Sequence, residues 1–80
     1  MVTPESIQID IARNMATQHL SVTGDGQHFE AIIVSQEFAG KSHIQRQQRV
    51  YKTLGDRMNG EIHALSMKTY TPDEWESGSK

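Results

Sequence analysis

The segment that most constrains the fold of this chain covers residues 29–38. It is rich in β-forming residues, and its alternation places Phe29 and Ile33 on one face of a strand. The opposite face is apolar as well, because it carries Ile32 and Val34. A strand that is apolar on both faces through its middle third is typical of the centre of a sheet. We therefore expect a sheet in which this strand has a neighbour on each side.

Two further segments supply the neighbouring strands. Residues 20–23 alternate between apolar and polar side chains, and the turn Gly24-Asp25-Gly26 separates them from the central strand. Two glycines around an aspartate are a strong turn signal, so the two strands are predicted to form a hairpin. Residues 62–70 alternate again and carry His63 near their start. This segment is the expected third strand.

Helices are expected before and between the strands. A Thr-Pro pair at positions 3 and 4 starts the first one, and apolar residues at four-residue spacing extend it over residues 4–16. Ser42 can cap a short helical turn over residues 42–46. A longer helix follows and ends at the C-cap pair Asn59-Gly60. Its predicted core face consists of Val50, Tyr51, Leu54 and Met58.

A last short helix follows the third strand. Residues 71–74 form a capping box with proline at the first helical position, and Trp75 comes directly after it. We expect Trp75 to cover an edge of the core and residues 76–80 to be a polar, frayed tail. The predicted order is α-β-β-α-α-β-α, an α+β fold in which helices cover a three-stranded sheet. The whole chain, residues 1–80, is predicted to be one domain.

Composition limits the chemistry. The net charge of −2 and the pI near 6.0 argue against a protein that mainly coats nucleic acid. The chain has no cysteine, which excludes a disulfide, a thiolate nucleophile and an iron–sulfur centre held by this chain alone. No apolar run approaches the length of a membrane span, and the N-terminal residues do not resemble a signal peptide, so the expected compartment is the cytoplasm.

Several spaced motifs together resemble one known family. The series extends over about residues 20–76 and is similar to the BolA family, in particular to its short bacterial members of the IbaG/YrbA type. The motifs that carry the resemblance are Val34-Ser35 with Phe38 and Gly40, the RQQRVY run from Arg46 to Tyr51, Ile62-His63-Ala64-Leu65-Ser66, and Thr71-Pro72 with Trp75.

This resemblance implies a fold similar to class II KH domains. It also implies pairing with a monothiol glutaredoxin, either around a shared [2Fe–2S] cluster or without one, in iron–sulfur trafficking, iron homeostasis or stress response. Some members of the family are described as DNA-binding transcription regulators, and their helices corresponding to residues 42–58 are compared to a helix-turn-helix.

The resemblance also names the site. His63 matches the family's histidine ligand to the shared cluster, and neutral imidazole is a common metal ligand. The second ligand of the family lies in the loop between the first two strands, where this chain has no cysteine. His28 is the preferred candidate here, with Asp25 or an external ligand as the alternatives. The predicted partner surface contains Asp25, His28 and His63, and the glutaredoxin's cysteine and glutathione would hold the other iron.

A second interpretation uses the basic helix over residues 45–58. Its cations could meet phosphates and its glutamines could reach base edges, although a solvated helix face explains the same pattern. RNA binding of the KH type is not expected, because the chain has no GxxG loop. Nor is catalysis, because no nucleophile has an obvious base. The candidate nucleic-acid-binding residues are Lys41, Arg46, Gln47, Arg49 and Lys52.

Overall fold

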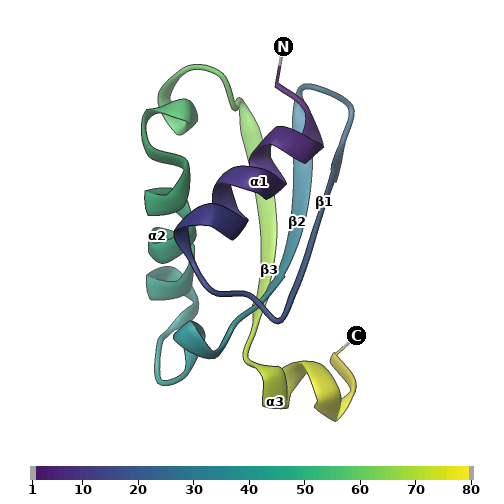
Figure 1. Ribbon diagram of the computed structural model, residues 1–80, viewed down its shortest axis with the longest axis vertical. Coiled ribbons are helices and arrows are strands. Elements are labelled where there is room, and N and C mark those ends of the chain that lie inside the picture. Colours follow the sequence, from purple (N-terminus) through teal and green to yellow (C-terminus); the bar gives the residue numbers. More distant parts are fainter. Residues whose placement is uncertain (1, 80) are drawn as a thin grey trace.

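The computed structural model describes residues 2–79 and has the α+β fold predicted from the sequence (Figure 1). In the described part of the chain, no helix is both long and apolar enough to cross a membrane. The elements are α1 (Pro4–Asn14), β1 (His19–Gly24), β2 (His28–Val34), α2 (His43–Leu54), β3 (Ala64–Tyr70) and α3 (Pro72–Glu74), with 3-10 turns at Gln36–Phe38 and Gly55–Asn59 and a π-helical turn at Trp75–Ser79.

The sheet has the strand order β1-β2-β3, so the prediction of a central second strand is confirmed. β1 and β2 are antiparallel and form the predicted hairpin. β2 and β3 are parallel, with His28 opposite Ala64, so both strands begin at the same end of the sheet. The connection between them runs through α2, because parallel neighbours cannot be joined by a tight turn.

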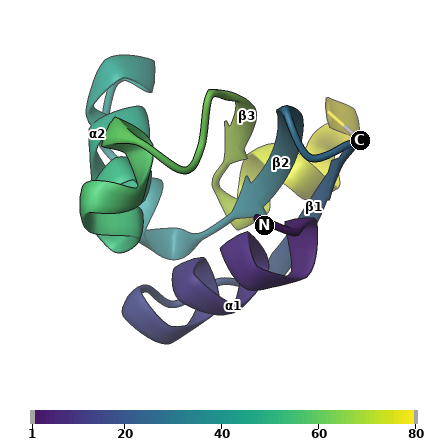
Figure 2. The same cartoon turned by 90° about the horizontal axis from the view of Figure 1, so that it is seen from above.

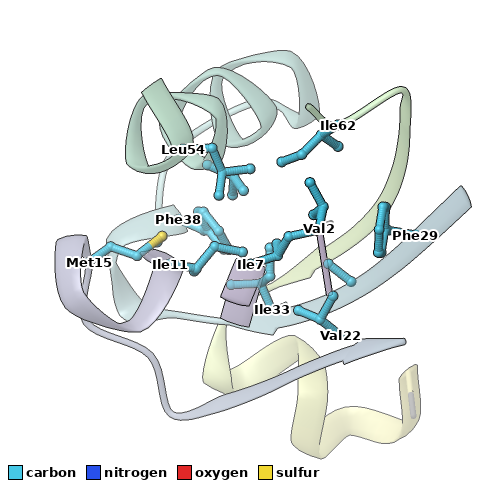
Figure 3. Close-up of a cluster of buried hydrophobic side chains, with 12 residues drawn as sticks. Val2, Ile7, Ile11, Met15, Val22, Phe29, Ile33, Phe38, Leu54 and Ile62 are labelled. Atoms are coloured by element: carbon cyan, nitrogen blue, oxygen red, sulfur yellow. The ribbon is translucent and has the colours of Figure 1, made fainter. Parts of the chain in front are cut away.

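The core lies between the sheet and the two long helices (Figures 2 and 3). α1 and α2 cover the face of β2 that carries Phe29 and Ile33, both of which are fully buried. α3 lies on the opposite side of the sheet (Figure 2). There Trp75 stacks on His19, with ring centroids 5.0 Å apart, and contacts Tyr70 at 5.4 Å. Trp75 therefore covers one end of the outer face of the sheet.

The central strand is shorter than the sequence predicted. It ends at Val34, and residues 36–38 form a 3-10 turn instead of continuing the strand. Ser35 causes the change, because its hydroxyl accepts a hydrogen bond from the N–H of Glu37 and donates one to the carbonyl of Ala16. β3 is also shorter than predicted. It begins at Ala64, so His63 lies just before the strand.

The prediction placed the break between the two helical segments of residues 42–58 near residue 46, and this position is wrong. One helix begins at His43, where Ser42 and Gln45 form a capping box, and it runs unbroken to Leu54. The break comes at Gly55, whose φ of 58° is in the left-handed region that favours glycine. This arrangement is a helix with a 3-10 extension and differs from a helix-turn-helix.

The buried face of α2 also differs from the prediction. Tyr51 was expected in the core but is 36% exposed, whereas Val50 and Leu54 are buried as expected. The remaining buried positions of the helix are polar, at Arg46 and Thr53. Thr53 donates its hydroxyl hydrogen to the carbonyl of Val50, which satisfies its polar group within the helix.

Arg46 connects α2 to α3. The residue is only 7% exposed, and its guanidinium makes a bidentate ion pair with Glu74, at 2.8 and 3.1 Å. The same group donates to the carbonyls of Lys41 and Thr69. Hydrogen bonds from Arg46, together with the N–H of Thr71, lower the pKa of the Glu74 carboxyl from 4.5 to about 2. The ion pair therefore needs a charged Glu74, and it stabilises the fold only where that charge persists.

We predict an acid-dependent loss of stability that depends on Glu74. A carboxyl whose pKa is depressed by folding contributes stability above its unfolded pKa, and this is lost as the pH falls from about 4.5 toward 2. Because Glu74 is partly exposed, we expect on the order of 1 kcal/mol, or about 4–8 °C in the unfolding midpoint. Thermal unfolding of wild type and Glu74→Gln between pH 6 and 2.5 measures this contribution to stability.

The exposed Glu76, in the same C-terminal turn, provides the matched control. Glu76→Gln should follow the wild-type curve, whereas Glu74→Gln should be less stable at pH 6 and lose less on acidification. Parallel curves for all three proteins would show that the Arg46–Glu74 pair does not contribute.

Candidate functional site

An open hollow lies where β2 and β3 begin. Its volume is about 600 Å³, and it is formed by the turn between β1 and β2 and by the loop that precedes β3. These segments are far apart in sequence and meet because the two strands are parallel and in register. His63 is exposed at this hollow. The lining residues are Val2, Asp25, Gly26, Gln27, Gly60, Glu61 and His63.

Asp25 organises the turn on one side of the hollow. Its Oδ1 accepts hydrogen bonds from the N–H groups of Gln27 and His28, each at 2.9 Å. These bonds, that from His28 first, lower the pKa of the Asp25 carboxyl. Gly26 has a φ of 102°, which a residue with a side chain rarely adopts. The turn therefore has a defined shape and presents an ionised carboxylate to the hollow.

Arg57 organises the loop on the other side. Its carbonyl accepts hydrogen bonds from the N–H groups of Gly60, Glu61 and Ile62, at 3.4, 3.0 and 2.9 Å. The side chain of Ile62 is buried in the core. His63 therefore follows directly after a residue that is held by both its backbone and its side chain.

The guanidinium of Arg57 connects this loop to α1. It donates to the carbonyl of Ser6 at 3.3 Å, to the Ser6 hydroxyl at 2.9 Å and to the carboxylate of Asp10. It also donates to Glu61 at 3.3 Å. The hydrogen bond with Asp10 is the main reason that the pKa of Arg57 is raised. Through these contacts, the loop that carries His63 is fastened to the first helix.

His28 lies close to the hollow without lining it. It is the first residue of β2 and is exposed. Because side chains alternate along a strand and Phe29 points into the core, His28 leaves the sheet on the opposite face. The structure thus brings Asp25 together with His63, whereas His28 is placed beside them on the outer face.

The donors at the hollow would complete a metal centre only with help from another molecule. Within residues 2–79, no group of three or more histidine, aspartate or glutamate side chains could hold a metal ion. Glu61 is hydrogen-bonded to Arg57, which leaves His63 and the turn as the available donors. One imidazole with one further ligand suits half of a shared centre whose other ligands come from a partner.

The structure divides the predicted nucleic-acid-binding set. Arg46 is buried against Glu74, and Arg49 donates to Glu37 at 3.0 Å and to the carbonyl of Asn14 at 3.0 Å. Both guanidinium groups connect elements of the fold, which leaves fewer of their N–H donors available to phosphates. Their role in nucleic-acid binding stays a prediction. The remaining three members of the set are exposed, namely Lys41, Gln47 and Lys52.

Sequence reasoning did not assign roles to Arg57 and Glu61 at the hollow. The only local signal was their four-residue spacing, which allows an ion pair on a helical turn. Asp10 lies 47 residues from Arg57 in sequence, and nothing local to either residue predicts that contact.

Comparisons with known proteins identify the family. Residues 1–74 match the family model described as BolA-like protein. The chain is 41% identical over 70 residues to the acid stress protein IbaG of Escherichia coli K12, covering 86% of this chain and 83% of that protein. It is 39% identical over 64 residues to the DNA-binding transcriptional regulator BolA of Haemophilus influenzae, covering 80% and 62%. The chain belongs to the BolA-like family.

A solved structure confirms the fold assignment. The structure of a BolA protein homologue from Coxiella burnetii is 44% identical and has a TM-score of 0.85, covering 95% of this chain and 99% of that one. The resemblance noted in the sequence and the α+β architecture are therefore both confirmed. The two curated relatives are named as a stress protein and a transcription regulator, and neither name denotes an enzyme.

We predict that Arg57 sets the order of the loop that carries His63. Arg57→Ala removes the side-chain bonds to Ser6, Asp10 and Glu61, so we expect a loss of about 1–3 kcal/mol in the free energy of unfolding. Amide hydrogen exchange at residues 60–63 should accelerate more than exchange in β2. Arg13→Ala, at an exposed position of α1, is the control. Unchanged exchange at residues 60–63 in Arg57→Ala would contradict this role.

Proposed function

We propose that this chain is an adaptor that binds a monothiol glutaredoxin and contributes His63 to a bridging [2Fe–2S] cluster. The observation that carries the proposal is the position of His63. It is exposed at a hollow between two loops and follows directly after the buried Ile62. An exposed ligand on an ordered loop can reach a centre held by another molecule without first being ordered itself.

The chemistry of the donors supports a shared centre. The chain has no thiolate, so the cysteine of the glutaredoxin and glutathione would hold one iron, and this chain would supply ligands to the other. Imidazole in place of thiolate raises the reduction potential of such a cluster, as in Rieske centres. The protein itself presents and orients the imidazole, and the hollow gives the partner's loop a place beside it.

The second ligand comes from the turn between β1 and β2. Asp25 lines the hollow with His63, but its Oδ1 already accepts two backbone hydrogen bonds. His28 leaves on the outer face beside the turn, and its imidazole suits iron better than a carboxylate does. We propose His28 as this ligand. Asp25 is the alternative, because it lines the same hollow as His63.

A role in iron–sulfur trafficking, iron homeostasis or stress response follows from this proposal, and the name of the IbaG relative is consistent with the last of these. DNA binding is the second candidate, because another relative is named a DNA-binding regulator. It would depend on Lys41, Gln47 and Lys52, since Arg46 and Arg49 are paired within the fold.

The test is a titration of the chain into cluster-loaded monothiol glutaredoxin, followed by visible circular dichroism. We expect a new spectrum that saturates at one equivalent and that His63→Ala abolishes. His43→Ala, which changes an exposed histidine of α2, should titrate like the wild type. If the wild type leaves the spectrum unchanged, or if His63→Ala gives the same new spectrum, the proposal is wrong.

Two further variants identify the second ligand. If His28 is the ligand, His28→Ala should shift the visible spectrum and make the cluster more labile, while Asp25→Asn, which can still accept the turn's hydrogen bonds, should leave the spectrum unchanged. The reverse pattern would assign Asp25. Wild-type spectra from both variants would place the second ligand outside this turn.

A further inference from the structure

β3 is an edge strand with an open hydrogen-bonding side. The carbonyl of Tyr70 faces β2, because it accepts the N–H of Ser35, whereas the carbonyl of Thr69 faces away and accepts from Arg46. Backbone groups alternate in direction along a strand, so those of Leu65 and Met67 also face away from β2. They have no hydrogen-bond partner among residues 2–79.

The other edge of the sheet is protected. The N–H of Val22 in β1 points outward, and the side-chain carbonyl of Gln8 in α1 accepts it at 3.2 Å. α1 thus covers part of this edge. Among residues 2–79, comparable protection of the outer side of β3 reaches only the carbonyl of Thr69, which accepts from Arg46. An uncovered edge strand is a template for pairing with another chain.

A groove of about 340 Å³ follows the open edge of β3, and residues of α2 and of the second half of β3 line it. Figure 1 shows α2 and β3 next to each other. Two exposed polar side chains of α2, His43 and Gln47, line it opposite the strand. A groove between an edge strand and a helix accepts an extended segment, which gains backbone hydrogen bonds from the strand and side-chain contacts from the helix.

The one lysine among the residues that line this groove is Lys68. It forms no ion pair with another residue of the part described, 2–79. The nearby carboxylate of Glu74 is neutralised by Arg46. A second copy of this chain would be disfavoured here, because antiparallel pairing of two β3 edges about Met67 would bring two Lys68 side chains to the same face. An acidic side chain of a bound segment would meet Lys68 favourably.

We propose that the open edge of β3 binds an extended acidic segment of a partner protein, about five residues long, as an added strand. The segment pairs with the backbone of Leu65 and Met67 and with the N–H of Thr69, whose carbonyl is occupied by Arg46, and its carboxylates meet Lys68. This groove lies toward the end of β3 that is remote from His63, so it is separate from the hollow and can be tested in the free protein.

The test uses nitrogen-15-labelled protein and a blocked peptide of alternating valine and glutamate, Val-Glu-Val-Glu-Val. We expect the amide signals of Met67 and Thr69 to shift on titration and their hydrogen exchange to slow. Lys68→Glu should weaken binding roughly three- to tenfold, because an attraction is replaced by a repulsion. Lys52→Glu is the matched control, since Lys52 is exposed on a side of α2 away from His43. The spectra of the free variants check that both remain folded.

Two control peptides make the result decisive. A peptide with lysine in place of glutamate should bind more weakly, and a peptide with N-methyl groups at alternate positions should not slow exchange, because it cannot complete the strand. Absence of shifts at Met67 and Thr69, or shifts confined to the hollow at His63, would overturn the proposal. So would tighter binding of a single-stranded oligonucleotide at the same amides, or protection of Met67 that rises with protein concentration alone, which would indicate nucleic acid or self-pairing.

Discussion

The parallel pairing of β2 with β3 is the constraint on which the rest of the structure depends. Because both strands begin at the same end of the sheet, the turn before β2 and the loop before β3 meet there, and His63 lies beside the β1–β2 turn. The same pairing requires a crossover, which α2 provides, and leaves β3 at the edge of the sheet. The hollow at one end of β3 and the groove near its other end both result from the parallel pairing of β3 with β2 at the edge of the sheet.

Arginine side chains hold the elements around this sheet together. Arg46 connects α2 to α3, Arg49 connects α2 to the turn after β2, and Arg57 connects the loop before β3 to α1. In a chain of 80 residues the apolar core is small, so contacts of this kind carry a larger share of the tertiary order. Guanidinium groups suit the task, because each offers several donors to carboxylates and carbonyls at once.

Much of the fold could be predicted from local patterns. The central strand was visible from its two apolar faces, the hairpin from its Gly-Asp-Gly turn, and the capped helix starts from their Thr-Pro pairs. The errors came from residues whose partners are distant in sequence. Arg46 looked like an exposed cation because Glu74 lies 28 residues away, and the strand was drawn too long because the partner of the Ser35 hydroxyl is the carbonyl of Ala16. Periodicity carries no information about such contacts.

We propose that His63 ligates iron in the complex with the glutaredoxin, and nitrogen hyperfine coupling detects such a bond. Pulsed electron paramagnetic resonance of the reduced complex, prepared with this chain labelled with nitrogen-15 only in histidine, detects any imidazole from this chain that is bonded to the cluster. We expect a nitrogen-15 coupling that His63→Ala removes or reduces by one ligand and that His43→Ala leaves intact. A reduced cluster without nitrogen-15 coupling, or one whose coupling persists unchanged in His63→Ala, would contradict it.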